Sequence, residues 1–364
     1  MATESSADEP APHYWWRRPA DGGGTPRHPL AVALQARWPG ALLCAVIAMA
    51  ASFVSRLHGG PQLLYALLFG VSFHFLLEDT KIRPGIEFCT GLVLRLGVAL
   101  LGARITVSQI AALGWSTALI VIGCVLSTIF GGIWLARRLG LSTTQGLLSG
   151  GATAICGASA ALAISAVLPR SRKQERFTLL VVVSVTSLST LAMLLYPLLV
   201  HALHLPPALA GLFLGGSIHD VAQVVGAGYL MGQETGDAAT IVKLFRVSML
   251  ALVVIVVSAA YRGARPTDTA IAGPARRAAL VPWFLWVFLA LVMLHSLHGI
   301  PEIAQPLIGD VSRGCLIVAI AALGVKTSFQ MLFDTGWRPF ALLLVETLWL
   351  AAALLIAILL TRPA

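Results

Sequence analysis

The chain alternates long apolar stretches with short polar ones along nearly its whole length beyond residue 38. Each apolar stretch approaches the roughly 20 residues that a helix needs to cross the hydrocarbon core of a bilayer. The pattern predicts an all-α polytopic membrane protein with about eleven transmembrane helices. The predicted spans are 38–55, 62–77, 86–103, 114–136, 144–168, 177–200, 207–231, 238–260, 281–297, 306–328 and 339–360.

The composition agrees with this pattern. Of the 364 residues, 57% are hydrophobic and 11% are charged, and the mean hydropathy is +0.85. Soluble domains carry about 25% charged residues, so a soluble globular protein is excluded. Residues 1–37 are polar and rich in Pro and Gly, which predicts a disordered tail. A leading transmembrane helix over 38–57 follows, and residues 262–280 form a polar connector between later spans.

The distribution of Lys and Arg predicts the orientation in the membrane. With the N-terminus inside, the cytoplasmic loops hold about twice as many basic residues as the opposite side. We therefore expect a multi-pass protein of the cell (inner) membrane with a cytoplasmic N-terminus. The basic cluster at 170–176 disagrees with this orientation. Either the rule is violated locally, or the fifth span is re-entrant and the chain returns to the side from which it came.

The fifth span contains the sequence Gly150-Gly-Ala-Thr-Ala-Ile-Cys-Gly-Ala-Ser159. Each glycine in a helix costs roughly 1 kcal/mol relative to alanine. A weakened helix at membrane depth is tolerated only where protein or a water-filled cavity satisfies the freed backbone groups. Transporters use such interruptions to direct half-helix ends at a substrate. The segment is therefore either one part of an ion-binding site or a place where small residues pack tightly.

A short sequence echo indicates an internal repeat. Phe69-Gly-Val-Ser-Phe-His74 resembles Leu214-Gly-Gly-Ser-Ile-His219 at a constant offset of 145. The echo divides the chain after its leading helix into two five-helix repeats, 62–200 and 207–360. Repeats with an odd number of spans insert in opposite directions, as in many secondary transporters. This pairing matches the fifth span with the tenth and predicts a second break at Ala321–Ser328. The alternative is that the similarity of the two segments arose by chance.

Charged side chains inside apolar spans are costly, and they usually face a cavity or a partner. Arg95 lies in the third span, and Lys243 and Arg246 lie on one face of the eighth. Asp220 lies in the seventh span and Glu346 in the eleventh. The basic residues either attract an anion together with helix N-termini, or form structural ion pairs with these two acids.

Enzyme and metal motifs are absent from the sequence. The chain contains no HExxH, no GxSxG and no Walker loop, and its five cysteines lack metal-type spacing. We expect no catalytic residues, no metal site and no cofactor, and therefore not an enzyme. The net charge of +9 comes from loop residues, so nucleic acid is not an expected partner.

Several motifs resemble the sulfate-exporter family of integral membrane proteins, also called the YeiH family. The resemblance implies the fold of the cation–proton antiporter and anion transporter superfamily, with two crossing broken helices and an elevator-type movement. It implies export of sulfate, sulfite or a sulfonate, and a homodimer. The chain departs from the family pattern at two positions. Asp220 stands where the family has Glu, and Lys326 stands where a neutral residue is expected. The matching segments are 94–97, 101–104, 155–158, 217–225, 241–247 and 322–324.

We therefore expect a secondary transporter that exports a small sulfur oxyanion or sulfonate across the lipid bilayer, with H⁺ or Na⁺ as coupling ion. The alternatives are a cation–proton antiporter that uses Asp220 and Glu346, and a passive anion channel or membrane sensor. Broken fifth and tenth spans would meet at the binding site. The predicted substrate-binding residues are Arg95, Thr153, Ala154, Ile155, Cys156, Gly157, Arg246, Lys326, Thr327 and Ser328, and the predicted coupling residues are His219, Asp220, Gln223 and Lys243.

Overall fold

The computed structural model describes residues 29–58, 61–169, 171–261, 282–327 and 337–361. Every regular element in these ranges is a helix, so the all-α prediction is confirmed. The predicted count of eleven full spans is not reproduced, because several predicted spans consist of shorter apolar helices. Among the described residues, seven helical segments are long and apolar enough to cross a membrane: Gln35–His58, Arg83–Leu101, Gly114–Arg138, Arg172–Ala202, Gln233–Ala260, Ala304–Lys326 and Trp337–Thr361.

The elements follow the predicted spans closely in order. In the first half they are α1 (Pro29–His58), α2 (Gln62–Ser72), η1 (His74–Glu78), α3 (Arg83–Phe88), η2 (Cys89–Val93), α4 (Leu94–Leu101), α5 (Val107–Ala112), α6 (Gly114–Arg138), α7 (Thr143–Ala154) and α8 (Ala158–Val167). In the second half they are α9 (Arg172–Ala202), α10 (Pro207–Ser217), α11 (Val221–Met231), α12 (Gln233–Ala260), α13 (Trp283–Ser296), α14 (Ala304–Lys326) and α15 (Trp337–Thr361).

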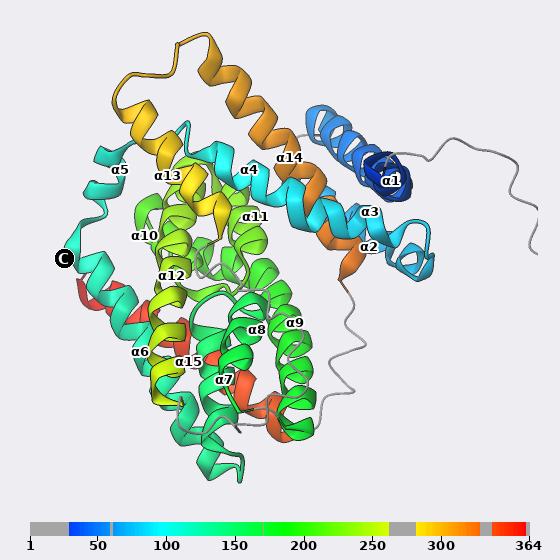
Figure 1. The fold of residues 1–364 in the computed structure, drawn as a ribbon. Helices are drawn as coiled ribbons and strands as arrows, with labels where there is room; N and C mark the ends of the chain where they lie inside the picture. Colours follow the sequence, from blue (N-terminus) through cyan, green and yellow to red (C-terminus); the bar gives the residue numbers. More distant parts are fainter. Residues whose placement is uncertain (1–28, 59–60, 170, 262–281, 328–336, 362–364) are drawn as a thin grey trace, which may run out of the picture.

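These helices form two bundles (Figure 1). The α14 bundle contains α1 to α4, α13 and α14, and the α12 bundle contains α6 to α12 and α15. Glycines allow the closest helix contacts within each bundle. A Cβ on Gly70 of α2 would lie 2.2 Å from the carbonyl oxygen of Ala321 in α14. Between the bundles, α11 packs against α14 and α2.

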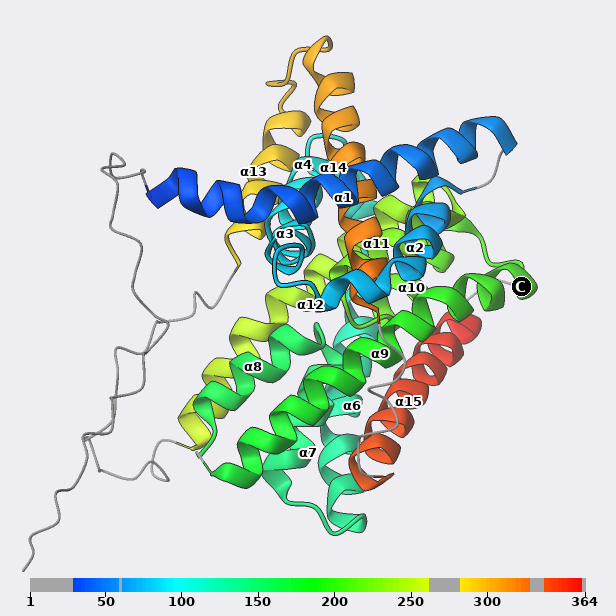
Figure 2. The same ribbon diagram turned by 90° about the vertical axis from the view of Figure 1, so that its right-hand side faces the viewer.

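α7 and α8 form a re-entrant hairpin rather than a crossing span. At the start of α7, Thr144 Oγ1 donates to Gln174 Oε1 in the first turn of α9 at 3.5 Å. Near the end of α8, the hydroxyls of Ser165 and Thr178 lie 2.9 Å apart. Both ends of the hairpin therefore lie beside the start of α9, at what we call the Arg138 end of the protein, where α6 also ends (Figure 2).

α10 and α11 form a second hairpin that inserts from the opposite, Arg104 end, where α9 ends. A Cβ on Gly211, in the first half of α10, would lie 2.5 Å from Ala238 Cβ. A Cβ on Gly228, near the end of α11, would lie 2.9 Å from the Cα of Gly236. Both outer ends of the hairpin thus lie against the start of α12. The chain leaves the hairpin on the side from which it came.

The break predicted in the fifth span is confirmed, because α7 ends at Ala154 and α8 begins at Ala158. The break predicted inside the tenth span is wrong. α14 is continuous from Ala304 to Lys326, and the predicted weak point is its C-terminal end. The second break lies in the seventh span, between α10 and α11. Its turn contains no glycine, although Gly215 and Gly216 lie just before it at the end of α10.

Two features bear on the predicted domain boundaries. α1 begins at Pro29, upstream of the predicted start at residue 38, so the last part of the predicted tail is helical. The rest of that tail and the connector at 262–280 lie outside the described residues. α2 and α10 each have 11 residues and each follow a proline, Pro61 and Pro206, at the offset of the sequence echo. The inverted five-helix repeat itself stays a prediction.

The first hairpin removes the conflict in the charge distribution. Since the hairpin returns to its starting side, Arg172, Lys173 and Arg176 at the start of α9 lie at the same end as Arg137 and Arg138. The basic residues of this region therefore gather on one side, as the positive-inside rule requires.

Cysteine labelling tests this topology. A membrane-impermeant thiol reagent should modify Ser142→Cys and Ser171→Cys from the same side of the membrane, and Pro206→Cys from the other. The described native cysteines are buried or half-buried, so labelling of the parent chain gives the background. Labelling of positions 142 and 171 from opposite sides would show that α7 and α8 cross the bilayer completely.

Candidate functional site

The tips of the two hairpins meet inside the α12 bundle. The first tip turns at Gly157, whose φ of +65° is a conformation that favours glycine. A Cβ at this position would lie 3.5 Å from the Cβ of His219 in the second tip. His219 is fully buried, and its Nδ1 lies 3.0 Å from the carbonyl oxygen of Thr153. The tips therefore form one continuous polar region at the centre of the bundle.

Arg246 of α12 joins the carbonyl ends of both hairpins. From Nε and Nη2 it donates to the carbonyl oxygen of Ala154 at 2.9 and 2.6 Å, and from Nη2 to that of Thr153 at 3.2 Å. From Nη1 it donates to the carbonyl oxygens of Gly215 and Ile218 at 2.9 and 3.0 Å. The side chain is completely buried. Its guanidinium group thus satisfies carbonyls that the last turns of α7 and α10 leave free.

Lys243 lies one turn earlier on the same face of α12, and it also donates to carbonyl oxygens of both hairpin tips. Its ammonium group donates to the carbonyl oxygens of Ile155 at 2.7 Å, Ile218 at 3.0 Å and His219. Positive charge at a helix C-terminus is favourable, because it complements the helix dipole. In the described part of the chain, neither Lys243 nor Arg246 has a carboxylate within 4.0 Å. The tips therefore hold two buried positive charges that form no direct ion pair in the described residues.

A cavity of about 360 Å³ lies beside the tips, between the two bundles. Ala158 and Ala222, in the first turns of α8 and α11, reach its wall. α8 has no side-chain cap, so the amides of its first turn are available to a ligand. The remaining polar wall includes Thr186 and Thr190 of α9 and Lys326 at the end of α14. The N-terminal ends of two half-helices thus face this space, and the uncapped end of α8 favours negative charge there.

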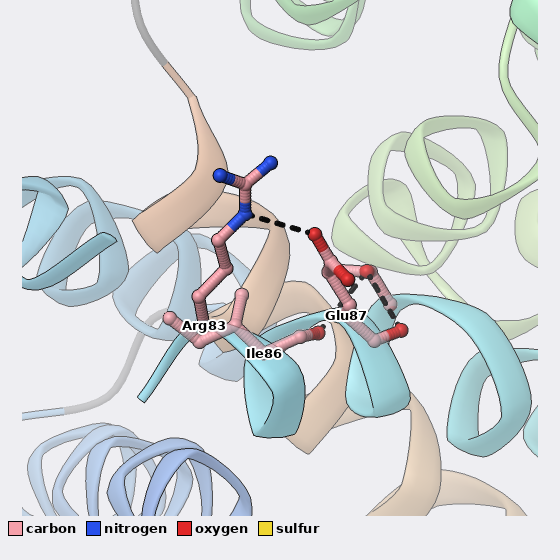
Figure 3. A network of polar contacts seen from close by, with 4 residues as sticks. Arg83, Ile86 and Glu87 are labelled. Atoms are coloured by element: carbon pink, nitrogen blue, oxygen red, sulfur yellow. Dashed lines mark hydrogen bonds and ion pairs between the residues drawn. The ribbon is translucent and has the colours of Figure 1, made fainter. Parts of the chain in front are cut away.

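The outer part of the cavity carries an ion pair on α3 (Figure 3). Arg83 Nε lies 3.0 Å from Glu87 Oε1, and the two side chains are 65% and 53% exposed. One turn later, Thr90 donates to the carbonyl oxygens of Ile86 at 3.1 Å and Glu87 at 3.4 Å. Because Arg83 and Glu87 also line the cavity, its rim lies at the surface of the described structure. Their charges offset each other.

The predicted substrate-binding residues fall into three groups. Lys326 and Thr327 line the cavity, and Ser328 lies outside the described residues. The segment 153–157 forms the first tip, and neither it nor Arg246 lines the cavity, because carbonyls of this segment bind Arg246 and Lys243 behind the cavity wall. Arg95 lies on an exposed face of α4 and does not line the cavity. Direct contact of any of these residues with a substrate stays a prediction.

The predicted coupling residues gather around the second tip. His219 Nε2 lies 3.0 Å from Thr347 Oγ1 of α15. Asp220 caps α11 by accepting from the amide of Ala222 at 2.7 Å, and it also lines the cavity. Gln223 is buried and donates to Thr190 Oγ1 at 2.8 Å, so it links α11 to α9. The structure thus brings His219, Asp220 and Gln223 together with Lys243.

Sequence reasoning missed the hydroxyl groups that support the tips. Ser189 of α9 accepts from the backbone amides of His219 at 3.2 Å and Asp220 at 3.1 Å. Ser149 of α7 donates to Glu346 at 2.7 Å. The run of Ser and Thr between 184 and 190, in an otherwise apolar span, could have indicated the hydroxyl groups of α9. Such hydroxyls commonly hydrogen-bond between helices in membranes.

A smaller cavity of about 190 Å³ lies between the bundles at the Arg104 end. With its amide oxygen turned toward Arg104, Gln233 accepts from both terminal nitrogens, from Nη1 at 2.9 Å. This contact ties the turn after α4 to the start of α12. A Cβ on Gly226 of α11 would lie 3.2 Å from Ile320 Cδ1 of α14, which shows how closely the bundles pack between the two cavities.

These features define a multi-pass helical membrane protein with two opposed re-entrant hairpins. Residues 39–343 match the family model described as conserved hypothetical protein 698. The chain is 49% identical over 322 residues to the UPF0324 membrane protein TauZ of Paracoccus pantotrophus, covering 87% of this chain and 94% of the relative. It is 47% identical over 319 residues to a UPF0324 membrane protein of Chlorobaculum tepidum, covering 87% and 88%.

The chain therefore belongs to the UPF0324 family of membrane proteins. The sequence resemblance to the family also called YeiH is thereby confirmed at the level of the family. No solved structure matches the chain.

Replacing Arg246 tests its role at the tips. Arg246→Met leaves four buried carbonyl oxygens without this donor, at about 1–3 kcal/mol for each that stays unsatisfied. We expect a clear fall in the thermal unfolding temperature in detergent and a smaller fall for Arg246→Lys. Arg176→Met, at an exposed position on α9, should leave the unfolding temperature unchanged. Equal unfolding temperatures for all three variants would contradict the structural role.

Proposed function

We propose that the protein is a secondary transporter of small anions. The observation that supports this proposal is the direction in which the helix ends point at the two hairpin tips. Lys243 and Arg246 bind the carbonyl ends of α7 and α10 on one side, while the N-terminal ends of α8 and α11 face the cavity on the other. Fixed positive charge behind the tips and the uncapped amide groups of α8 favour an anion in the cavity.

In this proposal Arg246 and Lys243 act from behind the tips, and the anion contacts other groups. The first-turn amides of α8 and the hydroxyls of Thr186 and Thr190 supply hydrogen bonds, and Lys326 supplies charge from α14. Sulfur oxyanions or sulfonates are the class that the resemblance in sequence implies. Asp220 faces the same cavity, and its carboxylate is occupied as the cap of α11.

Transport would proceed by movement of the α12 bundle, which holds both tips, along the α14 bundle. The large cavity reaches the tips from the Arg138 end, which the positive-inside rule assigns to the cytoplasm. The contact between Arg104 and Gln233 closes the interface near the other end. This arrangement suits an inward-facing state of an elevator-type exporter in the inner membrane. A homodimer through the α14 bundle stays a prediction from the resemblance.

Counterflow in proteoliposomes tests the substrate class. We expect vesicles loaded with unlabelled sulfate to accumulate labelled sulfate transiently, and we expect sulfite, thiosulfate, sulfoacetate or taurine to compete if the site accepts them. Lys326→Gln should raise the apparent KM about tenfold, because it removes a charge from the cavity wall. Lys173→Gln, on the exposed start of α9, is the matched control.

Failure of all five compounds to exchange or compete would exclude this substrate class. Proton flux that needs Na⁺ and no anion would favour the antiporter alternative instead. Flux without saturation and without counterflow would favour a channel.

Cross-linking tests the proposed movement. A short bifunctional thiol reagent should link Arg104→Cys with Gln233→Cys and stop transport, because the interface at this end must open in each cycle. Each single variant should retain transport after the same treatment. Full transport by the linked double variant would contradict a relative movement of the two bundles.

A further inference from the structure

A carboxylic acid without a cationic partner lies directly behind the first hairpin tip. Glu346 of α15 is only 3% exposed. Ser149 donates to its Oε1 at 2.7 Å, and Thr153 donates to its Oε2 at 3.1 Å. A Cβ on Gly132 of α6 would lie 2.4 Å from Oε1. The absence of a side chain at Gly132 therefore makes the space that the carboxyl group occupies.

The surroundings of Glu346 supply no salt bridge. No Lys, Arg or His nitrogen of the described residues lies within 4.0 Å of its carboxyl group. Of the helices packed against α15, α7 and α10 contain no titratable side chain. The charged residues of α6 lie in its last turn and those of α9 in its first turns. The other titratable groups on these two helices are Cys124 on α6 and Tyr196 and His201 on α9.

Two titratable groups, Arg246 and His219, are linked to Glu346 through threonines. The carbonyl oxygen of Thr153 accepts from Arg246 at 3.2 Å and lies 3.0 Å from His219 Nδ1. Thr347, the neighbour of Glu346 in α15, contacts His219 Nε2 at 3.0 Å. Glu346 is therefore coupled to the second tip and to Arg246 through hydrogen-bonded groups rather than by direct pairing.

We propose that Glu346 is the proton-binding site that couples transport to the proton gradient, an inference that rests on the proposed function. An ionised carboxylate in a buried site without a cation is costly, whereas the protonated form removes this cost. Thr153 connects the proton site to the first tip, because its side chain contacts Glu346 and its carbonyl group belongs to that tip.

Charge balance sets the direction of the coupling. With Glu346 protonated, Lys243 and Arg246 behind the tips and Lys326 in the cavity wall outweigh the negative charge of Asp220 at the second tip, and the net positive charge suits a dianion. Loss of the proton adds a negative charge behind the tip and weakens the attraction for the anion. Proton binding and anion binding therefore favour each other, and a proton moves in the same direction as the anion. A dianion that leaves with one proton still carries one net negative charge outward, the direction that an inside-negative membrane potential favours.

Glu346→Gln tests this role, since glutamine keeps the shape of a protonated glutamate and, like it, has one acceptor oxygen and one donor group; in both forms one of the two neighbouring hydroxyls accepts instead of donating. For the parent chain in proteoliposomes we expect sulfate counterflow whose apparent KM falls as the pH falls, and proton movement together with the anion. Glu346→Gln should keep counterflow, lose the pH dependence of KM and lose the proton movement. Glu175→Gln, an exposed acid on α9, should behave like the parent chain.

Infrared spectroscopy of the purified chain gives a measurement that does not need transport. The parent chain at neutral pH should show the carbonyl band of a protonated carboxylic acid, and Glu346→Gln should lack that band. An absent band in the parent chain, or unchanged pH dependence in Glu346→Gln, overturns the inference and leaves the transporter proposal standing. A band in a chain that transports none of the tested anions overturns the coupling role together with the transporter proposal.

Discussion

The arrangement of the protein depends on the hydrogen bonds that one face of α12 makes to the two hairpin tips. A helix that ends inside a membrane leaves carbonyl oxygens without partners, and water is not available there to satisfy them. Arg246 and Lys243 donate hydrogen bonds to the free carbonyl oxygens at the ends of both α7 and α10. Because both side chains extend from a continuous helix, they also fix the two tips relative to each other. Without them, two broken helices could not meet at this depth.

The hairpins determine where the charges of the chain lie. Since α7 and α8 return to the Arg138 end, the basic start of α9 joins the other basic residues there. Since α10 and α11 return to the Arg104 end, α12 crosses in the direction that brings Lys243 and Arg246 to the tips. Because each hairpin returns to the end from which it came, the same chain path determines both where the two breaks meet and on which side the basic residues lie.

The sequence was sufficient for the class of fold, the order of the helices and the first break. The first break was predictable because glycines accumulate there, yet Gly150 lies within α7, where a Cβ would approach Ile129 at 3.0 Å. Only Gly157 supplies the turn. The second break lies in a span that is equally rich in glycine. Its turn residues Ile218 and His219 are held by long-range contacts with Lys243, Ser189 and Thr153, and these contacts could not be predicted from the sequence. Arg95, in contrast, was expected at the site from its depth alone, and helix orientation places it on an exposed face.

The same contacts argue against a cation antiporter on this fold. Such an antiporter needs a carboxylate that a cation can reach from the cavity. Asp220 reaches the cavity, but one of its oxygens caps α11 and the carbonyl group of the preceding His219 binds the cationic Lys243, so a second cation there would be repelled. Glu346 lies behind the first tip, enclosed by Gly132, Ser149 and Thr153. The carbonyl ends that could bind a cation already hold Lys243 and Arg246. Because these built-in cations cannot leave, the cavity side of the tips keeps its positive character, and an anion is the ligand that this fixed charge suits.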